Sequence, residues 1–168
     1  MQKQETEKQF ENHIRTNELL IYKVCRMYTY TDADREDLFQ EIVIQLWNAY
    51  PKFKGESKFS TWLYRVALNT AISGLRKKKT FIESREPAQL PERASDENAG
   101  REEELLQLHK AIEHLNQVEK AIVMLYMEDR TFEEMEEILG MSQGNLRVKM
   151  NRIKEKLRQL TKIIDHGT

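Results

Sequence analysis

The chain has 168 residues with 27 basic and 28 acidic side chains, so its formal net charge is −1. This length allows one medium-sized domain or two small ones, and the balanced charge argues against a nucleic-acid binder that is basic throughout. The polar start MQKQETEK has no apolar signal-peptide core, and the longest apolar run, 121–127, is too short to cross a bilayer. We therefore expect a soluble cytoplasmic protein with no membrane insertion. The single Cys25 is expected to be a buried core residue in a reducing compartment.

Charge is segregated along the chain. Residues 59–79 carry basic side chains and no acid, and residues 142–162 carry basic side chains against Glu155 alone. Residues 32–41 are the reverse, with acids against Arg35. Local fields rather than net charge attract phosphate, although most charge runs on helices are simply solvated faces.

The first predicted helices lie between Phe10 and Tyr28, where apolar residues recur at helical spacing. This pattern predicts one amphipathic helix or a pair of helices with a core role. Thr31 or Asp32 is expected to cap the next helix. That helix has an apolar side formed by Leu38, Ile42, Ile44, Leu46 and Trp47. Its polar side carries Asp37, Gln40, Glu41 and Gln45. The polar side is either a solvated face or an acidic patch that docks a basic partner.

Pro51 is expected to end this helix, because proline has no amide hydrogen and disfavours helix in the preceding residue. The following loop, 51–58, places Phe53 between Lys52 and Lys54. An exposed phenylalanine between lysines suits base stacking with phosphate contacts nearby. An equally simple interpretation is that Phe53 fills the local core.

A third helix is predicted to follow, capped by Ser60 or Thr61. Its spacing aligns Trp62, Arg65 and Asn69 at i, i+3 and i+7. Stacking, cationic and amide groups in one stripe suit single-stranded nucleic acid, although a lone tryptophan is more often core. The helix ends with Arg76, Lys77, Lys78 and Lys79. These cations either contact phosphate or favour the helix dipole.

Residues 80–104 change in character, with two prolines, a glycine, eight acids and few large apolar side chains. This composition predicts a flexible acidic linker. The chain is therefore expected to be all-α, with two small helical domains at 1–79 and 105–168, joined by the linker 80–104.

The C-terminal part begins with a predicted helix from Leu105 to Leu115. Residues 116–119 and 131–134 both resemble capping boxes. Gly140 suits the left-handed position that stops a helix, and Ser142 is expected to cap the last one. The apolar stripe of that last helix is Leu146, Met150, Ile153, Leu157, Leu160 and Ile164.

A short helix, a tight turn with glycine and a second helix with a basic outer side form the helix-turn-helix pattern. The second helix would enter the major groove. Off its apolar stripe lie Arg147, Lys149, Asn151 and Arg152. Arginine and asparagine suit bidentate base contacts. The four histidines show no metal-ligand spacing, and the chain has no glycine-rich phosphate loop, so we expect no enzyme, no cofactor and no metal site.

Together these segments resemble a bacterial RNA polymerase sigma factor of the extracytoplasmic-function (ECF) group. The helix by which this family binds the clamp coiled coil of core polymerase resembles DREDLFQEIVIQLW. Its promoter-melting and −10-reading helix resembles FSTWLYRVALNTAISGLRKKK. Its −35-reading domain resembles LNQVEKAIVMLYMEDRTFEEMEEILGMSQGNLRVKMNRIKEKLR. The resemblance implies a protein that binds core polymerase, directs it to specific promoters and stabilises the melted −10 region.

The resemblance also implies three sets of site residues. The core polymerase-binding set is Asp37, Leu38, Gln40, Glu41 and Gln45. The −10 DNA-binding set is Lys52, Phe53, Lys54, Trp62, Arg65, Asn69, Arg76, Lys77 and Lys78, with the Phe53 loop and Asn69 capturing a flipped base. The −35 DNA-binding set is Ser142, Asn145, Arg147, Val148, Lys149, Asn151 and Arg152. The implied partners are the clamp and flap elements of core RNA polymerase and promoter DNA, both duplex and melted strand. An anti-sigma factor is a common further partner in this family.

Two positions depart from the family pattern. Asn116 stands where the family usually has a proline, and both residues start helices. Glu136 stands where the first helix of the helix-turn-helix usually has alanine. Its carboxylate is expected to tilt outward or find a cation; otherwise the two helices sit slightly apart.

Two other functions fit parts of the pattern. One is a transcriptional regulator that uses only the helix-turn-helix, with the N-terminal half as a sensor or dimerisation module. The other is an adaptor that binds polymerase without reading DNA.

Overall fold

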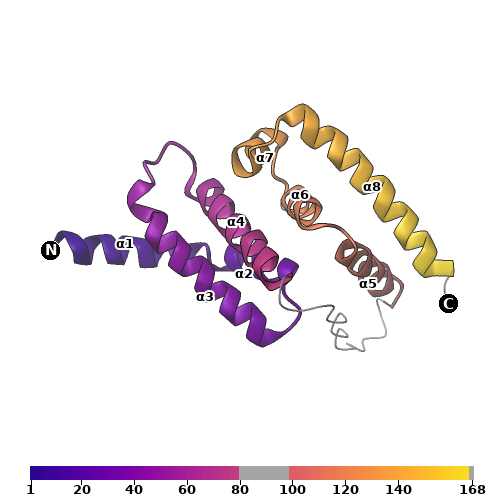
Figure 1. Ribbon diagram of the computed structural model, residues 1–168, viewed down its shortest axis with the longest axis horizontal. Helices are drawn as coiled ribbons and strands as arrows, with labels where there is room; N and C mark the ends of the chain where they lie inside the picture. Colours follow the sequence, from indigo (N-terminus) through magenta and orange to yellow (C-terminus); the bar gives the residue numbers. More distant parts are fainter. Residues whose placement is uncertain (80–98, 167–168) are drawn as a thin grey trace. The chain divides into compact units, whose positions relative to one another are not determined.

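The computed structural model describes the backbone of residues 1–79 and 99–166, and the side chains of residues 1–74 and 100–162 (Figure 1). These residues form helices and no strand, which confirms the all-α prediction. They divide into two compact units, the first containing α1–α4 and the second containing most of α5–α8. Residues 80–98 of the predicted linker lie outside the described part of the chain. None of the helices described is long and apolar enough to pass through a bilayer.

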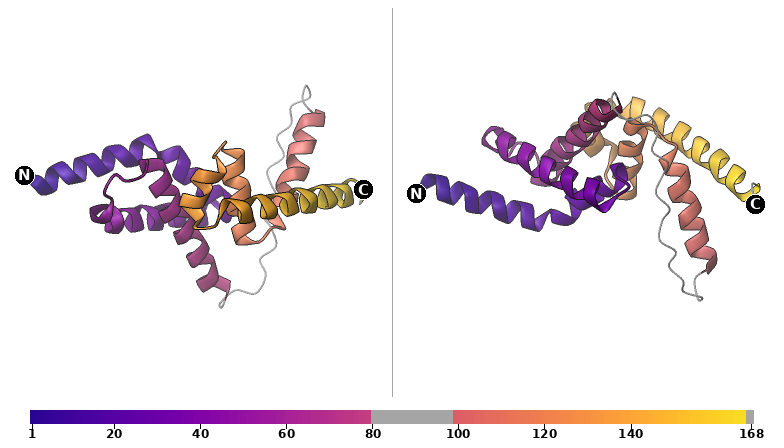
Figure 2. Two further views of the ribbon diagram at one scale, coloured as in Figure 1. Left: turned by 90° about the horizontal axis from the view of Figure 1, so that it is seen from above. Right: turned by 60° about the horizontal axis from the view of Figure 1, so that its bottom comes forward.

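The first unit begins with α1 (Gln2–Thr16) and α2 (Glu18–Tyr28), so the predicted first element is a helix pair (Figure 2). The break is at Asn17, whose side-chain amide donates to the backbone oxygen of His13 at 2.9 Å. Only Phe10 of α1 is buried, whereas α2 buries a full side of the helix. Its Cys25 is inaccessible to solvent, and this burial raises the pKa of the thiol to about 11.

The long helices α3 (Asp32–Ala49) and α4 (Phe59–Lys79) pack against each other and against α2. Thr31 caps α3, because its side-chain oxygen accepts a hydrogen bond from the Asp34 amide at 3.1 Å. The helix ends at Ala49 and is followed by a 3-10 turn, η1 (Tyr50–Lys52), which contains Pro51. This agrees with the prediction that Pro51 ends the helix, because proline has no amide hydrogen to continue it. The predicted cap of α4 is wrong: the helix begins at Phe59, so Ser60 and Thr61 lie inside its first turn.

The predicted apolar side of α3 is too wide. Ile42 and Leu46 are fully buried, but Ile44 is 52% exposed and Trp47 is 38% exposed. Residues four apart share one side of a helix, whereas residues two apart point to opposite sides. Because α2 and α4 cover the side of Ile42 and Leu46, Ile44 must face outward.

The second unit contains α5 (Ala99–Glu113), α6 (Gln117–Met127), α7 (Phe132–Leu139) and α8 (Gln143–His166). Helix α5 starts six residues before Leu105, so the end of the predicted linker is helical. Helix α8 packs against α5 and α6. The centre of this unit is formed by fully buried side chains: Ala121, Ile122, Leu125, Met135 and Leu146.

Local hydrogen bonds set the ends of these helices. Asn116 and Glu119 form the predicted capping box, with bonds of 2.8 and 2.9 Å between each side chain and the other's backbone amide. The second predicted box is only half formed: Thr131 accepts from the Glu134 amide at 3.1 Å, but the Glu134 carboxylate pairs with Arg130 at 3.7 Å. The ion pair with Arg130 competes with the second hydrogen bond of the box, in which the Glu134 carboxylate would accept from the Thr131 amide.

The segment between α7 and α8 forms the turn of the predicted helix-turn-helix. Gly140 ends α7 with a φ of 69°, the left-handed conformation that glycine adopts without steric cost. The Ser142 hydroxyl then accepts a hydrogen bond from the Asn145 amide at 3.2 Å, which caps α8. Short helix, glycine turn and capped long helix are therefore present as predicted.

Gly140→Ala should lower the free energy of unfolding by about 1–2 kcal/mol, because a Cβ is strained at this φ. Gly144→Ala is the matched control, because Gly144 is helical and also has open space around its Cβ position. That change should leave stability unchanged or raise it by up to about 1 kcal/mol. Urea unfolding followed by circular dichroism measures both. Equal stabilities of the two variants would contradict the left-handed turn.

Candidate functional site

The outward side of α3 combines acidic, amide and apolar groups. Asp37, Gln40 and Ile44 lie at i, i+3 and i+7 and are all exposed. Glu41 and Gln45 are exposed beside them and are joined by a hydrogen bond of 3.0 Å. We call the set Asp37, Gln40, Glu41, Ile44, Gln45 and Trp47 the α3 patch.

The α3 patch differs from the predicted polymerase-binding set in its apolar members. Leu38 was predicted to belong to the set but is only partly exposed. Ile44 and Trp47, which the sequence pattern places on the apolar side of the helix, are exposed at 52% and 38%. The spacing that aligns Ile44 with Asp37 and Gln40 was the signal that could have identified it. Trp47 keeps one edge-to-face contact with Phe10 of α1, with ring centroids 5.0 Å apart.

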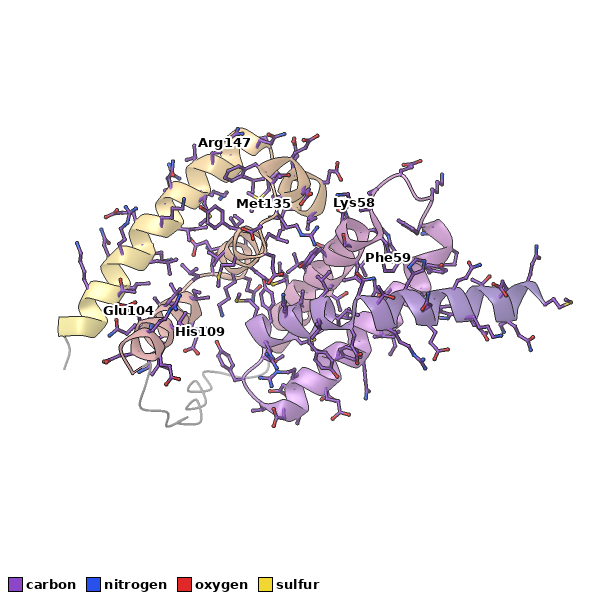
Figure 3. The ribbon with its side chains drawn as sticks, turned by 180° about the vertical axis from the view of Figure 1, so that it is seen from behind. Lys58, Phe59, Glu104, His109, Met135 and Arg147 are labelled. Carbon is purple, nitrogen blue, oxygen red and sulfur yellow. The ribbon has the colours of Figure 1, made fainter. Side chains whose placement is uncertain are left out.

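The loop after α3 is held by an aromatic cluster. The ring of Phe53 lies 5.6 Å from that of Phe59 and 5.0 Å from that of Trp62. Phe59 is the first residue of α4 (Figure 3). His13 of α1 stacks on its ring, with ring centroids 4.3 Å apart. Trp62 also meets Tyr50 edge-on, at 6.4 Å. The contacts of Phe53 support the interpretation that it fills the local core.

The predicted stripe on α4 is therefore divided. Trp62 is only 9% exposed, while Arg65 and Asn69 are exposed. The burial of Trp62 agrees with the alternative interpretation of a core tryptophan, and its membership of the −10 set stays a prediction. Lys52 and Lys54 are exposed on either side of Phe53. Three further members of the predicted −10 set lie in the last turns of α4 but have side chains outside the described part: Arg76, Lys77 and Lys78.

Helix α8 presents most of the predicted −35 set to solvent. Leu146, Met150 and Ile153 are buried at 0%, 4% and 1% exposure. The other side of the helix carries exposed Asn145, Arg147, Val148, Asn151 and Arg152, with Lys149 partly exposed. Ser142, also exposed, is engaged as the helix cap.

Several cations of α8 are held by their own unit. The Arg147 guanidinium lies 5.1 Å from the centre of the Phe132 ring, and both residues line an open pocket of about 580 Å³ between α6, α7 and α8. Lys154 lies 4.7 Å from the Tyr126 ring, and Lys156 pairs with Glu119 at 3.2 Å. Outside these contacts, Lys149 and Arg152 line a smaller pocket of about 130 Å³ beside the start of α6.

Glu136 finds a neutral partner. The side-chain amide of Gln143 donates to its carboxylate at 3.0 Å, across the turn between α7 and α8. A cation was one of the alternatives expected for this carboxylate, and the structure gives it an amide partner instead. Among the described residues, no group of three or more His, Cys, Asp or Glu side chains could hold a metal ion.

Comparisons with known proteins agree with this arrangement. Residues 13–81 match Sigma-70 region 2, and residues 105–157 match Sigma-70, region 4. The ECF RNA polymerase sigma-E factor of Escherichia coli K12 is 31% identical over 136 residues, which cover 73% of this chain and 71% of that protein. The chain belongs to the ECF group of RNA polymerase sigma factors.

Other relatives match more narrowly. The ECF sigma factor SigG of Mycobacterium tuberculosis is 43% identical over 51 residues, which are 30% of this sigma factor and only 14% of SigG. Two solved structures share the fold. The sigma factor RpoE of Bartonella quintana, in complex with the anti-sigma factor NepR, has a TM-score of 0.72 at 21% identity and covers 93% of this chain and 98% of its own. CnrH, in complex with the cytosolic domain of CnrY, has a TM-score of 0.67 at 18% identity and covers 96% of this chain and 91% of its own.

Phe53→Ala should destabilise this sigma factor by about 1–2 kcal/mol, because it removes the ring contacts with Phe59 and Trp62. Lys54→Ala, at the exposed neighbouring position, should change stability by less than about 0.5 kcal/mol. Urea unfolding of both variants measures the difference. A Phe53→Ala protein as stable as the parent would show that Phe53 is not part of the cluster in solution.

Proposed function

We propose that this sigma factor binds core RNA polymerase, directs it to promoters with −10 and −35 elements, and stabilises the melted −10 strand. It makes and breaks no bond, because RNA synthesis is the reaction of polymerase, and it acts where polymerase does, in the cytoplasm. The predicted division is kept as part of this proposal. Residues 1–79 would bind polymerase and the −10 element, and residues 105–168 would read the −35 element.

The α3 patch is the observation that carries the polymerase-binding role. An exposed isoleucine ringed by carboxylates and amides has the anatomy of a protein interface, with an apolar centre and a polar rim. The carboxylates Asp37 and Glu41 would guide a basic partner surface into place, which makes association faster at low salt. A helix-turn-helix regulator with a separate sensor domain has no need of such a patch, and an adaptor has no need of the exposed basic side of α8.

The DNA-binding roles remain those predicted from the sequence, with one change in the first unit. In the first unit, Lys52, Lys54, Arg65 and Asn69 have the exposure that contact with a melted strand requires, whereas Phe53 and Trp62 would shape the loop from within. In the second unit, the outer side of α8 would enter the major groove at the −35 element.

An anti-sigma protein is a further proposed partner. The two solved structures that share this fold are both complexes: the sigma factor RpoE with the anti-sigma factor NepR, and CnrH with the cytosolic domain of CnrY. A regulator of this kind would act by competing for the polymerase- or DNA-binding surfaces.

Run-off transcription with purified core polymerase on promoter fragments from the source genome tests the proposed function, with permanganate footprinting to detect melted thymines. Transcripts and an open bubble that both depend on this protein are the expected result. Duplex binding with neither polymerase association nor a bubble would identify a helix-turn-helix regulator instead.

Ile44→Ala should weaken binding to core polymerase about tenfold, because it removes the apolar centre of the α3 patch. Met127→Ala is the matched control: Met127 is 53% exposed at the end of α6, in the other unit. Fluorescence anisotropy with labelled protein measures both dissociation constants. An unchanged Kd for Ile44→Ala, or equal losses in the two variants, would remove the α3 patch from the interface.

Asn69→Ala should reduce the permanganate reactivity of the −10 thymines several-fold while leaving the affinity for polymerase unchanged. The Asn69 amide is exposed, and one hydrogen bond to a base contributes about 0.5–1.5 kcal/mol. Asn12→Ala, which changes an exposed asparagine of α1, should leave both measurements unchanged. Equal loss of opening and polymerase binding in Asn69→Ala would indicate misfolding rather than a base contact.

A further inference from the structure

Val148 lies in the second turn of α8, on the side of the helix opposite its buried residues. Successive helix residues are rotated by about 100°, so Val148 points away from the side buried by Leu146, Met150 and Ile153. Its side chain is 49% exposed, the one large apolar side chain so exposed among the described residues of α8. A single exposed valine is ordinary on a protein surface, so its meaning depends on its neighbours.

The neighbours of Val148 are arranged for close approach to a groove. Gly144, one turn earlier, has no atom within 4 Å of where a Cβ would be, so the surface is low on that side. Arg152, one turn later, is exposed. Arg147 and Lys149 flank Val148 in sequence and diverge to opposite sides of the helix. Arg147 lies against Phe132 of α7, whereas Lys149 faces the pocket beside α6.

Glu155, further along α8, limits the length of the helix that can lie close to DNA. Glu155 lies two turns after Val148 on the same side and pairs with Arg158 at 3.3 Å. A carboxylate repels DNA phosphates, so the close contact is confined to the first turns of α8. Within those turns the central group is apolar and its two sides are cationic. This distribution favours nucleic acid over an apolar or basic protein surface.

We propose that Val148 determines specificity by packing against the 5-methyl group of a thymine in the −35 element. The thymine methyl is the apolar group that base pairs present in the major groove, and an aliphatic side chain is its natural contact. Arg147 and Lys149, on either side of Val148, contact the backbone phosphates and set how deeply α8 enters the groove. These phosphate contacts carry no sequence information by themselves. This inference rests on the proposed function and adds a base-reading role that charge alone does not provide.

Replacement of thymine by deoxyuridine tests this contact, because it removes the methyl group and leaves base pairing intact. The promoter is one that gives transcripts in the run-off experiment, prepared as a set of variants that each have one −35 thymine replaced by deoxyuridine. Binding of each variant to the complex of core polymerase with the full-length protein is then measured. With the parent protein, one position should bind about fourfold more weakly, the effect of burying one methyl-sized group. With Val148→Ala, the unmodified promoter should bind about as weakly, and deoxyuridine at that position should cause no further loss.

Met127→Ala is the matched control, since Met127 is 53% exposed at the end of α6, off the outer side of α8. It should keep the fourfold deoxyuridine effect. Alanine has a higher helix propensity than valine, so Val148→Ala does not weaken α8. Indifference of the parent protein to every substitution, a −35 element without thymine, or a deoxyuridine effect that persists in Val148→Ala would each overturn the proposal. Failure of the parent protein to form any promoter complex with polymerase would instead overturn the proposed function, and this inference with it.

Discussion

The burial of Leu146, Met150 and Ile153 fixes the rotation of α8, and each assignment on its outer side depends on that rotation. A helix with one anchored side has little freedom to present another, because turning it would expose three large apolar side chains at about 1.5–3 kcal/mol each. The packed side therefore decides which residues meet solvent. The local turn contributes as well: the left-handed Gly140 and the Ser142 cap set where α8 begins, and so how far along it the exposed residues lie.

The same constraint acts on α3 in the other unit. Ile42 and Leu46 anchor that helix against α2 and α4, and Ile44 is consequently turned outward among carboxylates and amides. Helices α3 and α8 thus each have an apolar inner side and an exposed aliphatic residue with polar neighbours on the outer side. The chemistry of those neighbours differs. Acids surround Ile44 and cations flank Val148, so the two surfaces suit partners of opposite charge.

Local chemistry made much of the fold predictable from the sequence. Caps at Thr31, Asn116 and Ser142 depend on hydrogen bonds within four residues, so their spacing in the sequence is sufficient. Predictions that required tertiary packing were less successful. Whether Ile44 or Ile42 faces the core depends on the position of α2 and α4, and Trp62 is buried by rings that come from the preceding loop and helix. Glu136 meets Gln143 because the α7–α8 turn brings together residues seven positions apart, which no helical periodicity indicates.

The buried thiol of α2 limits how thiol reagents can act on this protein. Cys25 is the only cysteine in the chain, and its pKa of about 11 leaves roughly one thiol in ten thousand ionised at pH 7. Oxidants and disulfides react with thiolates that they can reach, and Cys25 is fully covered. The folded protein is therefore insensitive to thiol oxidation. A thiol reagent can reach Cys25 only when the packing around α2 opens.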